Sequence, residues 1–558
     1  MTDEKNTFEN NCDDKYQCRS PNDDEYYCNA EPTGVYNGGC LSLAQQLLAC
    51  RFHDHQSAVC GAKSTTAGHS TANEQNDDTS RRMDIYEKHS EETLIRIWHI
   101  QCTIVVTLIA IALARVAVHN KFITAPKVSR NGGGGAMSSF MKVFILEFLV
   151  ISLPAVVSVN ILNSYVEYIL AIAIMALIAI VWRSKCMERA SERVFEFGRR
   201  PIIFTLLRAT ISLLTALCIL AIDFESFPKK FRKTRRYGAG LMDVGIGLFV
   251  FSMALVSPKA KRLVDLRKML VPIACMLILG LARTIVITTI DYHQDEHEYG
   301  VHLNAFFTLG LTKLFATGLG FMASSDKHLL PMGIAILIIH EITLQCGISS
   351  FVLNPDLERT NFLTANREGL CSLPGFIALY LLSQYIGQWI KSKDVLNFQE
   401  IKQKLIHLTV AGVALWLIVI NSTMVIGIAR VTCNFGYVTW MLAIAVTMCA
   451  LYLFVFDIVL DTLLPVNGEP IMEMRQPSEK VALTSNVGGW SKIPTLIEAI
   501  NYNGLIYFLL GNVLTGAVNI FLKTDERTDT ESVIILMGYM FLTSLVVSLM
   551  YRYKLRIA

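Results

Sequence analysis

The fold is decided by uncharged segments such as NFGYVTWMLAIAVTMCALYLFVF, which occupies residues 434–456. A hydrocarbon core about 30 Å thick is crossed by roughly 20 helical residues at 1.5 Å each. Inside lipid the backbone must satisfy its own hydrogen bonds, so an apolar segment of this length forms a helix. Residues 434–456 therefore predict a membrane-spanning helix.

Similar segments recur on both sides of this one, and short polar connections separate them. The same criterion predicts about thirteen spans with ends placed to within a few residues. They are 95–117, 139–160, 163–182, 202–222, 239–257, 269–290, 303–323, 329–350, 370–390, 405–428, 434–456, 500–522 and 531–551. The predicted fold class is all-α, a polytopic transmembrane helical bundle, because a membrane barrel would show short alternating segments instead.

The composition agrees with this class. Of 558 residues, 52% are hydrophobic and only 17% are charged, whereas about a quarter are charged in a typical soluble protein. The net charge of +3 gives no reason to expect a nucleic-acid partner. We find no P-loop and no dinucleotide-binding fingerprint.

Residues 1–90 form a polar, cysteine-containing extension, and residues 91–558 form the predicted membrane domain. The cysteines of the extension are Cys12, Cys18, Cys28, Cys40, Cys50 and Cys60. An even set suggests disulfides if that side of the membrane is oxidising; a disordered tail with free thiols is the alternative. Because Met1 opens a polar stretch, we expect no cleavable signal peptide.

The distribution of Lys and Arg predicts the orientation, because cytosolic loops carry an excess of both. Loops after odd-numbered spans hold most of them, as in residues 183–200, 259–268 and 552–556. The C-terminus is therefore predicted to be cytosolic and the N-terminus lumenal or external. One loop on the predicted lumenal face breaks the rule, with basic residues at Lys229, Lys230, Arg232, Lys233, Arg235 and Arg236. It predicts a site for an anionic lipid headgroup or a membrane-surface anchor.

Ionisable side chains at membrane depth are costly and are candidates for function or for interhelical pairs. They are Glu147, Glu167, Arg208, Asp223, Asp243, Arg283, His340, Glu341 and Asp457. The most concentrated signal is the segment from Asp223 to Lys233, at the end of the fourth span. A carboxylate and an amine at a membrane interface suit acyl transfer, because one accepts a proton from a hydroxyl and the other stabilises an oxyanion.

Three further polar clusters each precede an apolar segment, and we expect all three on the lumenal face. An Asn or Glu in this position is commonly a helix cap, but three clusters and the basic loop together predict a shared polar pocket. Their candidate substrate-binding residues are Glu298, His302, Asn304, Asn366, Arg367, Glu368 and Asn503.

These stretches resemble the GPI inositol acyltransferases, the PIG-W family, also called GPI-anchored wall transfer proteins. The similarity extends from about Tyr86 to the C-terminus and does not include the extension. It is carried by residues 221–228, 237–252, 298–304, 366–369, 503–505 and 512–516. Asp243 and Asn512 fall within these motifs and join the candidate substrate-binding residues.

The resemblance implies a multi-pass enzyme of the endoplasmic reticulum membrane with thirteen helices. Such an enzyme transfers a fatty acyl chain, usually palmitoyl, from acyl-CoA to the inositol 2-hydroxyl of glucosaminyl-phosphatidylinositol. It also implies a catalytic Asp–Lys pair, which falls on Asp223 and Lys233, and Arg208 has a counterpart in the family. Acyl-CoA, the glycolipid and membrane lipids are then the expected partners.

Our mechanistic hypothesis is direct transfer, with Asp223 as general base and Lys233 polarising the thioester carbonyl or orienting Asp223. Lys229, Lys230 and Arg232 would meet phosphates. We expect no metal and no tightly bound cofactor, since the thioester is already activated. The alternatives are a lipid transporter or flippase, a non-catalytic scaffold, and another membrane-bound O-acyltransferase with His340 as its catalytic residue.

Overall fold

The structure, a computed structural model, describes residues 72–122, 133–198, 201–258, 263–289, 296–464 and 492–557. Internal contacts divide the chain into a unit Met1–Thr71 and a unit Ala72–Ala558, and the second is described below. The six cysteines of the extension lie outside the described residues, so their disulfides stay a prediction. The first described helix, α2 (Ala72–Phe122), begins inside the segment that the sequence assigns to the extension.

Helices make up nearly all of the described part of the second unit. After α2 they are α3 (Gly133–Val159), α4 (Val166–Arg183), α5 (Cys186–Ser191), α6 (Ile202–Ala221), α7 (Leu241–Val256), α8 (Leu263–Thr289), α9 (Ala305–Met322), α10 (Leu329–Thr343), α11 (Ser349–Leu353), α12 (Phe362–Ala365), α13 (Arg367–Ile390), α14 (Phe398–Val425), α15 (Phe435–Tyr452), α16 (Asp461–Leu463), α17 (Thr495–Tyr502), α18 (Gly504–Phe521) and α19 (Asp529–Arg552).

Short pieces of other structure complete the described chain. Two three-residue strands, β1 (Val194–Glu196) and β2 (Val395–Asn397), pair antiparallel with Phe195 opposite Leu396. The 3₁₀ turns are η1 (Asn163–Tyr165), η2 (Lys229–Phe231), η3 (Asp326–His328) and η6 (Thr524–Glu526), and the π-helical segments are η4 (Leu344–Ile348) and η5 (Leu453–Leu460). These pieces leave the predicted helical class unchanged.

Twelve helices among the described residues are long and apolar enough to cross a membrane. The predicted span 239–257 corresponds to α7, whose 16 residues make it a shorter apolar helix. At 1.5 Å per residue α7 is about 24 Å long, less than the hydrocarbon thickness of about 30 Å. The predicted span 500–522 is divided, because α17 ends at Tyr502 and α18 starts at Gly504. The chain is a multi-pass helical membrane protein.

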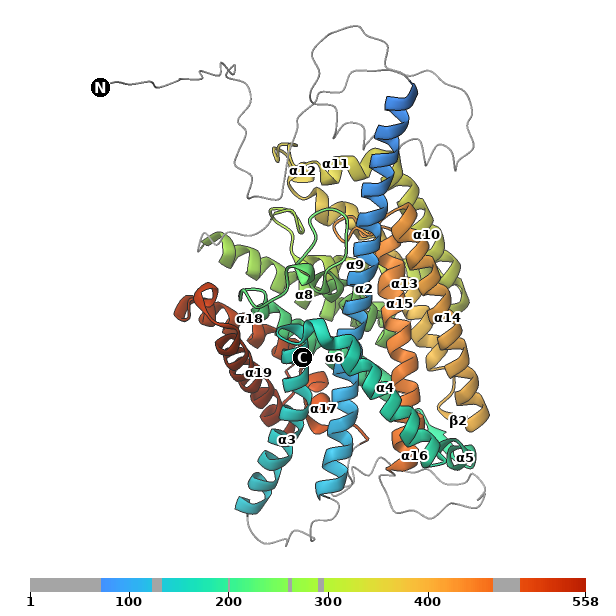
Figure 1. Ribbon diagram of the computed structural model, residues 1–558, viewed down its shortest axis with the longest axis vertical. Coiled ribbons are helices and arrows are strands. Elements are labelled where there is room, and N and C mark those ends of the chain that lie inside the picture. The colour runs from blue at the N-terminus through green and yellow to red at the C-terminus, as the bar shows by residue number, and fades with distance from the viewer. Residues whose placement is uncertain are drawn as a thin grey trace, which may run out of the picture. The chain divides into compact units, whose positions relative to one another are not determined.

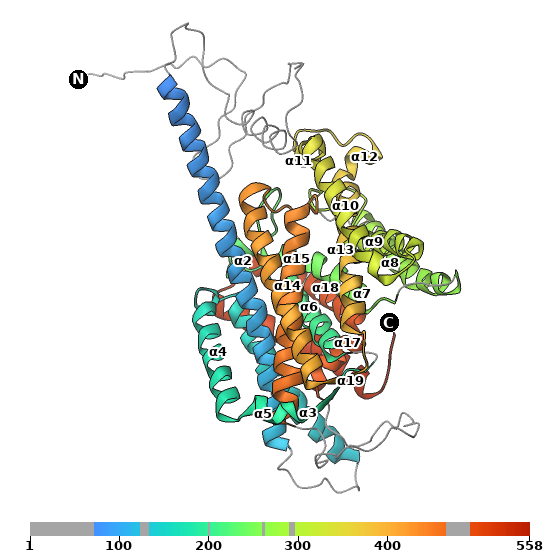
Figure 2. The ribbon, with the colours of Figure 1, turned by 90° about the vertical axis from the view of Figure 1, so that its right-hand side faces the viewer.

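The centre of the bundle is formed by α6 and its neighbours. Helix α6 packs on α7, α15, α17 and α18, and α7 packs in turn on α13 and α9. Figure 1 shows α17 and α19 beside α3, and Figure 2 shows α9 next to α13, with α8 against α9. In contrast, only 11% of the apolar window is buried in the spans that contain α4 and α8. Apolar side chains on such a surface are compatible with lipid, which is as apolar as they are.

Candidate active site

A cavity of about 630 Å³ opens between α6, α7, α8, α9 and α18. This volume is within the range of small-molecule sites. Its wall follows α7 from Met242 to Val256 and continues to Pro258. Fourteen helical steps correspond to about 21 Å, so the cavity accompanies α7 over almost its whole length.

The charged side chains lining this cavity are mainly basic. Five cations line it and one carboxylate, Glu298, does so. The cations are Arg208, Lys233, Lys268, Arg283 and Lys313. The candidate Asn512 lines it too, from the middle of α18. A cavity of this charge favours a ligand that combines apolar and anionic parts.

The basic loop between α6 and α7 is fixed by aromatic side chains. Phe224, Phe227 and Phe231 are almost completely buried, and the last two rings lie 6.0 Å apart. Burial of a Phe side chain stabilises the folded chain by roughly 1.5–3 kcal/mol. Because buried rings alternate with charged residues, the loop is held in place while Lys233 remains 39% exposed.

Lys233 belongs to a chain of four alternating charges. Its ammonium lies 2.7 Å from the Glu298 carboxylate, whose other oxygen lies 3.5 Å from Arg430. Arg430 in turn donates to the buried carboxylate of Asp243 at 2.9 Å. Asp243 also accepts hydrogen bonds from the amide and hydroxyl of Thr234, the residue after Lys233. We call Lys233, Glu298, Arg430 and Asp243 the charge chain; it returns to the loop from which it starts.

The charge chain favours the ionised forms of Glu298 and Arg430. Burial alone would raise the pKa of Glu298, but the charges of Lys233 and Arg430 lower it below its ordinary value. Burial opposes the charge of Arg430, yet the neighbouring Glu298 raises its pKa above the ordinary value. Buried charges are tolerated when they are paired and hydrogen-bonded in this way. Asp243 and Glu298 therefore help to hold Lys233 in position. Their binding of substrate stays a prediction.

Asp223 follows the last turn of α6 and has a different partner. Its carboxylate accepts a hydrogen bond of 2.9 Å from the side-chain amide of Asn519, near the end of α18. Burial raises the pKa of Asp223, while the Asn519 hydrogen bond and the charges of Arg232 and Lys233 act in the opposite direction. Thus Lys233 influences Asp223 electrostatically, but its hydrogen bond goes to Glu298.

Lys229 and Lys230 differ in their surroundings. Lys229 is exposed, as an anchor for phosphates would require. Lys230 lies 3.1 Å from the Nδ1 atom of His99 on α2, and the Nε2 atom of the same ring is 3.2 Å from Glu167 on α4. Burial lowers the pKa of Lys230. Lys230 therefore connects the loop to two other helices.

The segment before α9 is held by Asn366. The Oδ1 atom of Asn366 accepts from the amides of His302 and Leu303, and its Nδ2 atom lies 3.1 Å from His302 Nδ1. Gly300 has φ of +98° and passes so close to Asn366 that a side chain would collide with its Cα atom. Asn304 caps α9, accepting from the amides of Phe306 and Phe307. Asn304 and Asn366 thus shape the backbone beside Glu298.

Arg367 and Glu368 also have structural partners. Arg367 is buried and donates to four backbone carbonyls between Val352 and Thr364. Glu368, also buried, accepts two hydrogen bonds from Arg359. Both side chains organise the connection between α10 and α13, and neither lines the large cavity among the residues described.

The expectation that all three polar clusters share one face is wrong for Asn503. Its amide donates to the carbonyl of Leu555 and accepts from the amide of Ile557 at the end of α19. Asn503 precedes α18, whereas Asn519, sixteen residues along that helix, contacts Asp223. Sixteen residues of helix span about 24 Å. The two ends of α18 therefore lie far apart, and Asn503 is distant from the end that contacts Asp223.

Comparison with known proteins places this arrangement in a family. The family profile named GWT1 matches residues 88–550, which include all predicted spans, the last of them except for residue 551, and the whole charge chain. The chain belongs to the GWT1 family. The match starts close to residue 90, where the sequence predicts the membrane domain to begin.

Relatives of this GWT1-family chain carry descriptive names. It is 31% identical over 373 residues to GPI-anchored wall transfer protein 1 of Schizosaccharomyces pombe, with 64% of this chain and 73% of that protein covered. It is 30% identical over 440 residues to the glucosaminyl-phosphatidylinositol-acyltransferase PIGW of Bos taurus, with 72% and 86% covered. The resemblance stated from the motifs is confirmed.

Three further ionisable candidates of this GWT1-family chain have partners within the fold. Glu147 caps the start of α17 by accepting from the amides of Thr495 and Leu496. Glu341 accepts from the amide of Phe435. His340, the residue required by the rival acyltransferase mechanism, lies 3.0 Å from the Thr432 carbonyl and is absent from the described lining of the large cavity.

Sequence reasoning missed Arg430, Lys313 and Asn519 in this GWT1-family chain. Arg430 is an isolated cation between two spans on the predicted lumenal face, so the charge rule that singled out the basic loop also applied to it. Lys313 is an ionisable residue at membrane depth and met the criterion used for Arg208. Asn519 carries no such signal, because its role depends on the proximity of the ends of α6 and α18.

Proposed function

We propose that this chain transfers a fatty acyl group from acyl-CoA to the inositol 2-hydroxyl of glucosaminyl-phosphatidylinositol during GPI-anchor biosynthesis. The relatives named as acyltransferases and wall transfer proteins support the reaction class. The observation that carries the proposal is the large cavity, which places Lys233 and Glu298 on a long, largely apolar wall. Palmitoyl is the acyl group we propose.

The cavity suits an acyl-CoA as donor. Its apolar residues match a hydrocarbon chain, and its five cations match phosphates. Arg208 on α6 and Lys313 on α9 face this cavity from two sides, so they are placed to bind phosphate oxygens together. Lys268 lies at the far end, beside Pro258. An acyl-CoA combines an apolar chain with phosphates, so it matches both the apolar and the cationic parts of the wall.

The transfer step uses Asp223 and Lys233. Asp223 accepts the proton of the inositol 2-hydroxyl while that oxygen attacks the thioester carbon. Lys233 donates a hydrogen bond to the developing oxyanion. An ammonium has three donors, and one is used by Glu298. The carbon–sulfur bond then breaks, CoA leaves as a thiolate that takes up a proton, and the ester remains on inositol.

We place the protein in the endoplasmic reticulum membrane, with its N-terminus lumenal and its C-terminus cytosolic. In this orientation the Asp223 loop faces the lumen, while Lys268 and Pro258 are at the cytosolic end of α7 and α8. The large cavity then gives a cytosolic acyl-CoA a route to a lumenal glycolipid. Epitopes inserted after Glu225 and after Lys393 should be accessible from opposite sides of sealed microsomes; accessibility from the same side would overturn this orientation.

Acyl transfer from labelled palmitoyl-CoA by the purified full chain tests the proposed reaction. We expect Asp223→Asn to lower turnover about 10²–10⁴-fold, the usual contribution of a general base. Glu225→Gln, an exposed carboxylate in the same loop, serves as the matched control and should retain activity. Normal turnover by Asp223→Asn would remove Asp223 as the base.

The same assay separates the rival functions. Lys233→Arg keeps the positive charge, so retained activity would assign Lys233 an electrostatic role, and loss would assign it a role that needs the ammonium geometry. Loss of turnover in His340→Ala together with activity in Asp223→Ala would favour the other acyltransferase mechanism. Movement of glycolipid between leaflets without ester formation would favour a transporter.

A further inference from the structure

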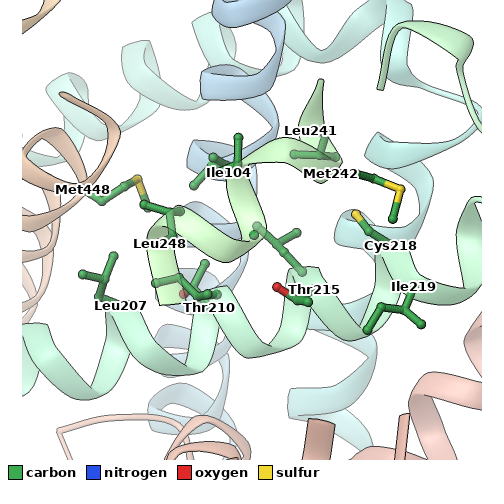
Figure 3. A pocket seen from close by; sticks show the side chains of 14 residues that line it. Ile104, Leu207, Thr210, Thr215, Cys218, Ile219, Leu241, Met242, Leu248 and Met448 are labelled. Carbon is green, nitrogen blue, oxygen red and sulfur yellow. The ribbon is translucent and has the colours of Figure 1, made fainter. Parts of the chain in front are cut away.

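A second, smaller cavity lies behind the wall of the large one. Its volume is about 60 Å³, and it is lined by α6 and α7 together with side chains from α2 and α15. Figure 3 shows Met448 and Leu207 at one end and Met242 and Cys218 at the other. The residues that line it in the described part of the chain are uncharged. A cavity with an apolar lining accepts apolar ligands.

The two cavities have a common wall. Thr215 and Ile219 of α6 and Met242 and Gly245 of α7 line both. At Gly245 the nearest atom that an added Cβ would meet is the Thr215 hydroxyl oxygen, at 3.8 Å, so the helices leave ordinary van der Waals space there. Met242 is only partly buried, and its unbranched side chain adapts readily to a neighbouring group. The wall is therefore thin and partly formed by a flexible side chain.

We propose that the small cavity receives the distal end of the acyl chain and thereby sets the chain length of the donor. This inference rests on the proposed acyl transfer. The thioester lies at Lys233 in the large cavity, the chain passes Met242 and Gly245, and its methyl end lies between α6 and α7. The CoA portion remains with the cations of the large cavity, because the small cavity offers no charged partner.

The position of the small cavity fits this assignment. Its wall follows α6 from Leu207 to Ile219, twelve positions or about 18 Å. Ile219 lies one helical turn before Asp223, so the wall starts beside the reacting groups and leads away from them. An apolar space of this small volume suits the end of a hydrocarbon chain rather than a headgroup.

The small volume makes the cavity selective. It has room for roughly four to six groups of the size of water or methylene, at about 10–15 Å³ each. Burial of one methylene changes binding about fourfold. A chain that is one or two carbons too long meets the packed end near Met448, and a chain that is too short leaves the space empty. The preferred length of the acyl chain should therefore change in steps as the side chains that line the small cavity are enlarged or shortened.

Leu214→Ala and Leu217→Ala are a matched pair of tests on α6. Both side chains are buried, but only Leu214 lines the small cavity. Initial rates with palmitoyl-CoA and stearoyl-CoA are measured on the same preparation of full chain, so their ratio is independent of the amount of folded protein. We expect Leu214→Ala to raise the stearoyl-to-palmitoyl ratio about fourfold or more, and Leu217→Ala to leave it unchanged.

Cys218→Leu fills the same cavity and should move the preference towards myristoyl-CoA. Wild-type ratios in both Leu214→Ala and Cys218→Leu would overturn the assignment, as would an equal shift in Leu217→Ala. In either case the wild-type chain still transfers acyl groups, so the proposed function stands. Absence of transfer by the wild-type chain from every donor tested would instead remove the proposed function and this inference with it.

Discussion

The Nζ atom of Lys233 and the Oε2 atom of Glu298 lie 2.7 Å apart, although 65 residues separate them in the chain. This contact joins the loop after α6 to the segment before α9. It gives Lys233 a fixed partner other than Asp223. Lys233 is thereby held at the edge of the large cavity, where its remaining donors can meet a carbonyl oxygen.

Glu298→Gln should lower kcat more than it raises KM. The substitution removes the charge that holds Lys233 but keeps the size of the side chain, and loss of such a supporting contact commonly costs 10–100-fold in activity. Steady-state kinetics with palmitoyl-CoA check this. Glu296→Gln, which removes the pairing with Arg359 instead, is the control, and an equal loss in both variants would contradict a specific role for Glu298.

Arg430→Met should destabilise the folded chain by about 3–5 kcal/mol, because it leaves the carboxylates of Asp243 and Glu298 without their common cation. Thermal unfolding of the purified chain in detergent measures this loss. Lys523→Met breaks an exposed pair with Glu526 and should cost under about 1 kcal/mol. Similar unfolding temperatures for the two variants would show that the charge chain does not support the fold.

The pH profile of acyl transfer should reflect the raised pKa of Asp223. A general base acts when deprotonated, so activity falls as the pH drops through its pKa, and a raised pKa moves this acidic limb above that of an ordinary aspartate. Asn519→Ala removes a hydrogen bond that lowers this pKa, so the limb should move to still higher pH. Asn354→Ala, an exposed site, should not move it. An unchanged limb in Asn519→Ala would exclude Asp223 as its origin.

Folding of the segment before α9 should be sensitive to Gly300. A side chain there meets the Asn366 backbone, and the positive φ adds strain, so Gly300→Ala should destabilise by at least about 1–3 kcal/mol. Gly318→Ala lies in open space within α9 and should be neutral or stabilising by roughly 0.5–1 kcal/mol. Unfolding temperatures of the two variants, compared in one detergent, test the difference.

The sequence predicted the helices well because a membrane requires long apolar segments, and each such segment can be recognised from its own residues. Each predicted span has a helix, including 139–160, where α3 continues through Pro154, and the short segment 239–257. The length of α7 and the break at Asn503 were less predictable. Both depend on neighbouring helices, which replace lipid contacts around α7 and hold Asn503 against Leu555.

The candidate site was predicted in part. The sequence indicated Lys233, Glu298 and Asp243 as individual residues, but only the folded chain brings in Arg430 and joins the four. Asn304 caps a helix, and Arg367 donates to backbone carbonyls. A polar residue that precedes a helix commonly has a structural role of this kind. Pairings across long sequence separations leave no local pattern, so no reading of one sequence could have assigned Asn519 to Asp223.

The short helix α7 has a consequence for the lipid substrate. A helix of 16 residues leaves about 6 Å of a 30 Å hydrocarbon layer uncrossed, and non-helical backbone is tolerated at that depth only where protein or a water-filled space surrounds it. We therefore expect the Asp223 loop to lie below the level of the surrounding headgroups. A glycolipid can present its inositol ring from the side, without rising out of its leaflet, and turnover should vary with bilayer thickness.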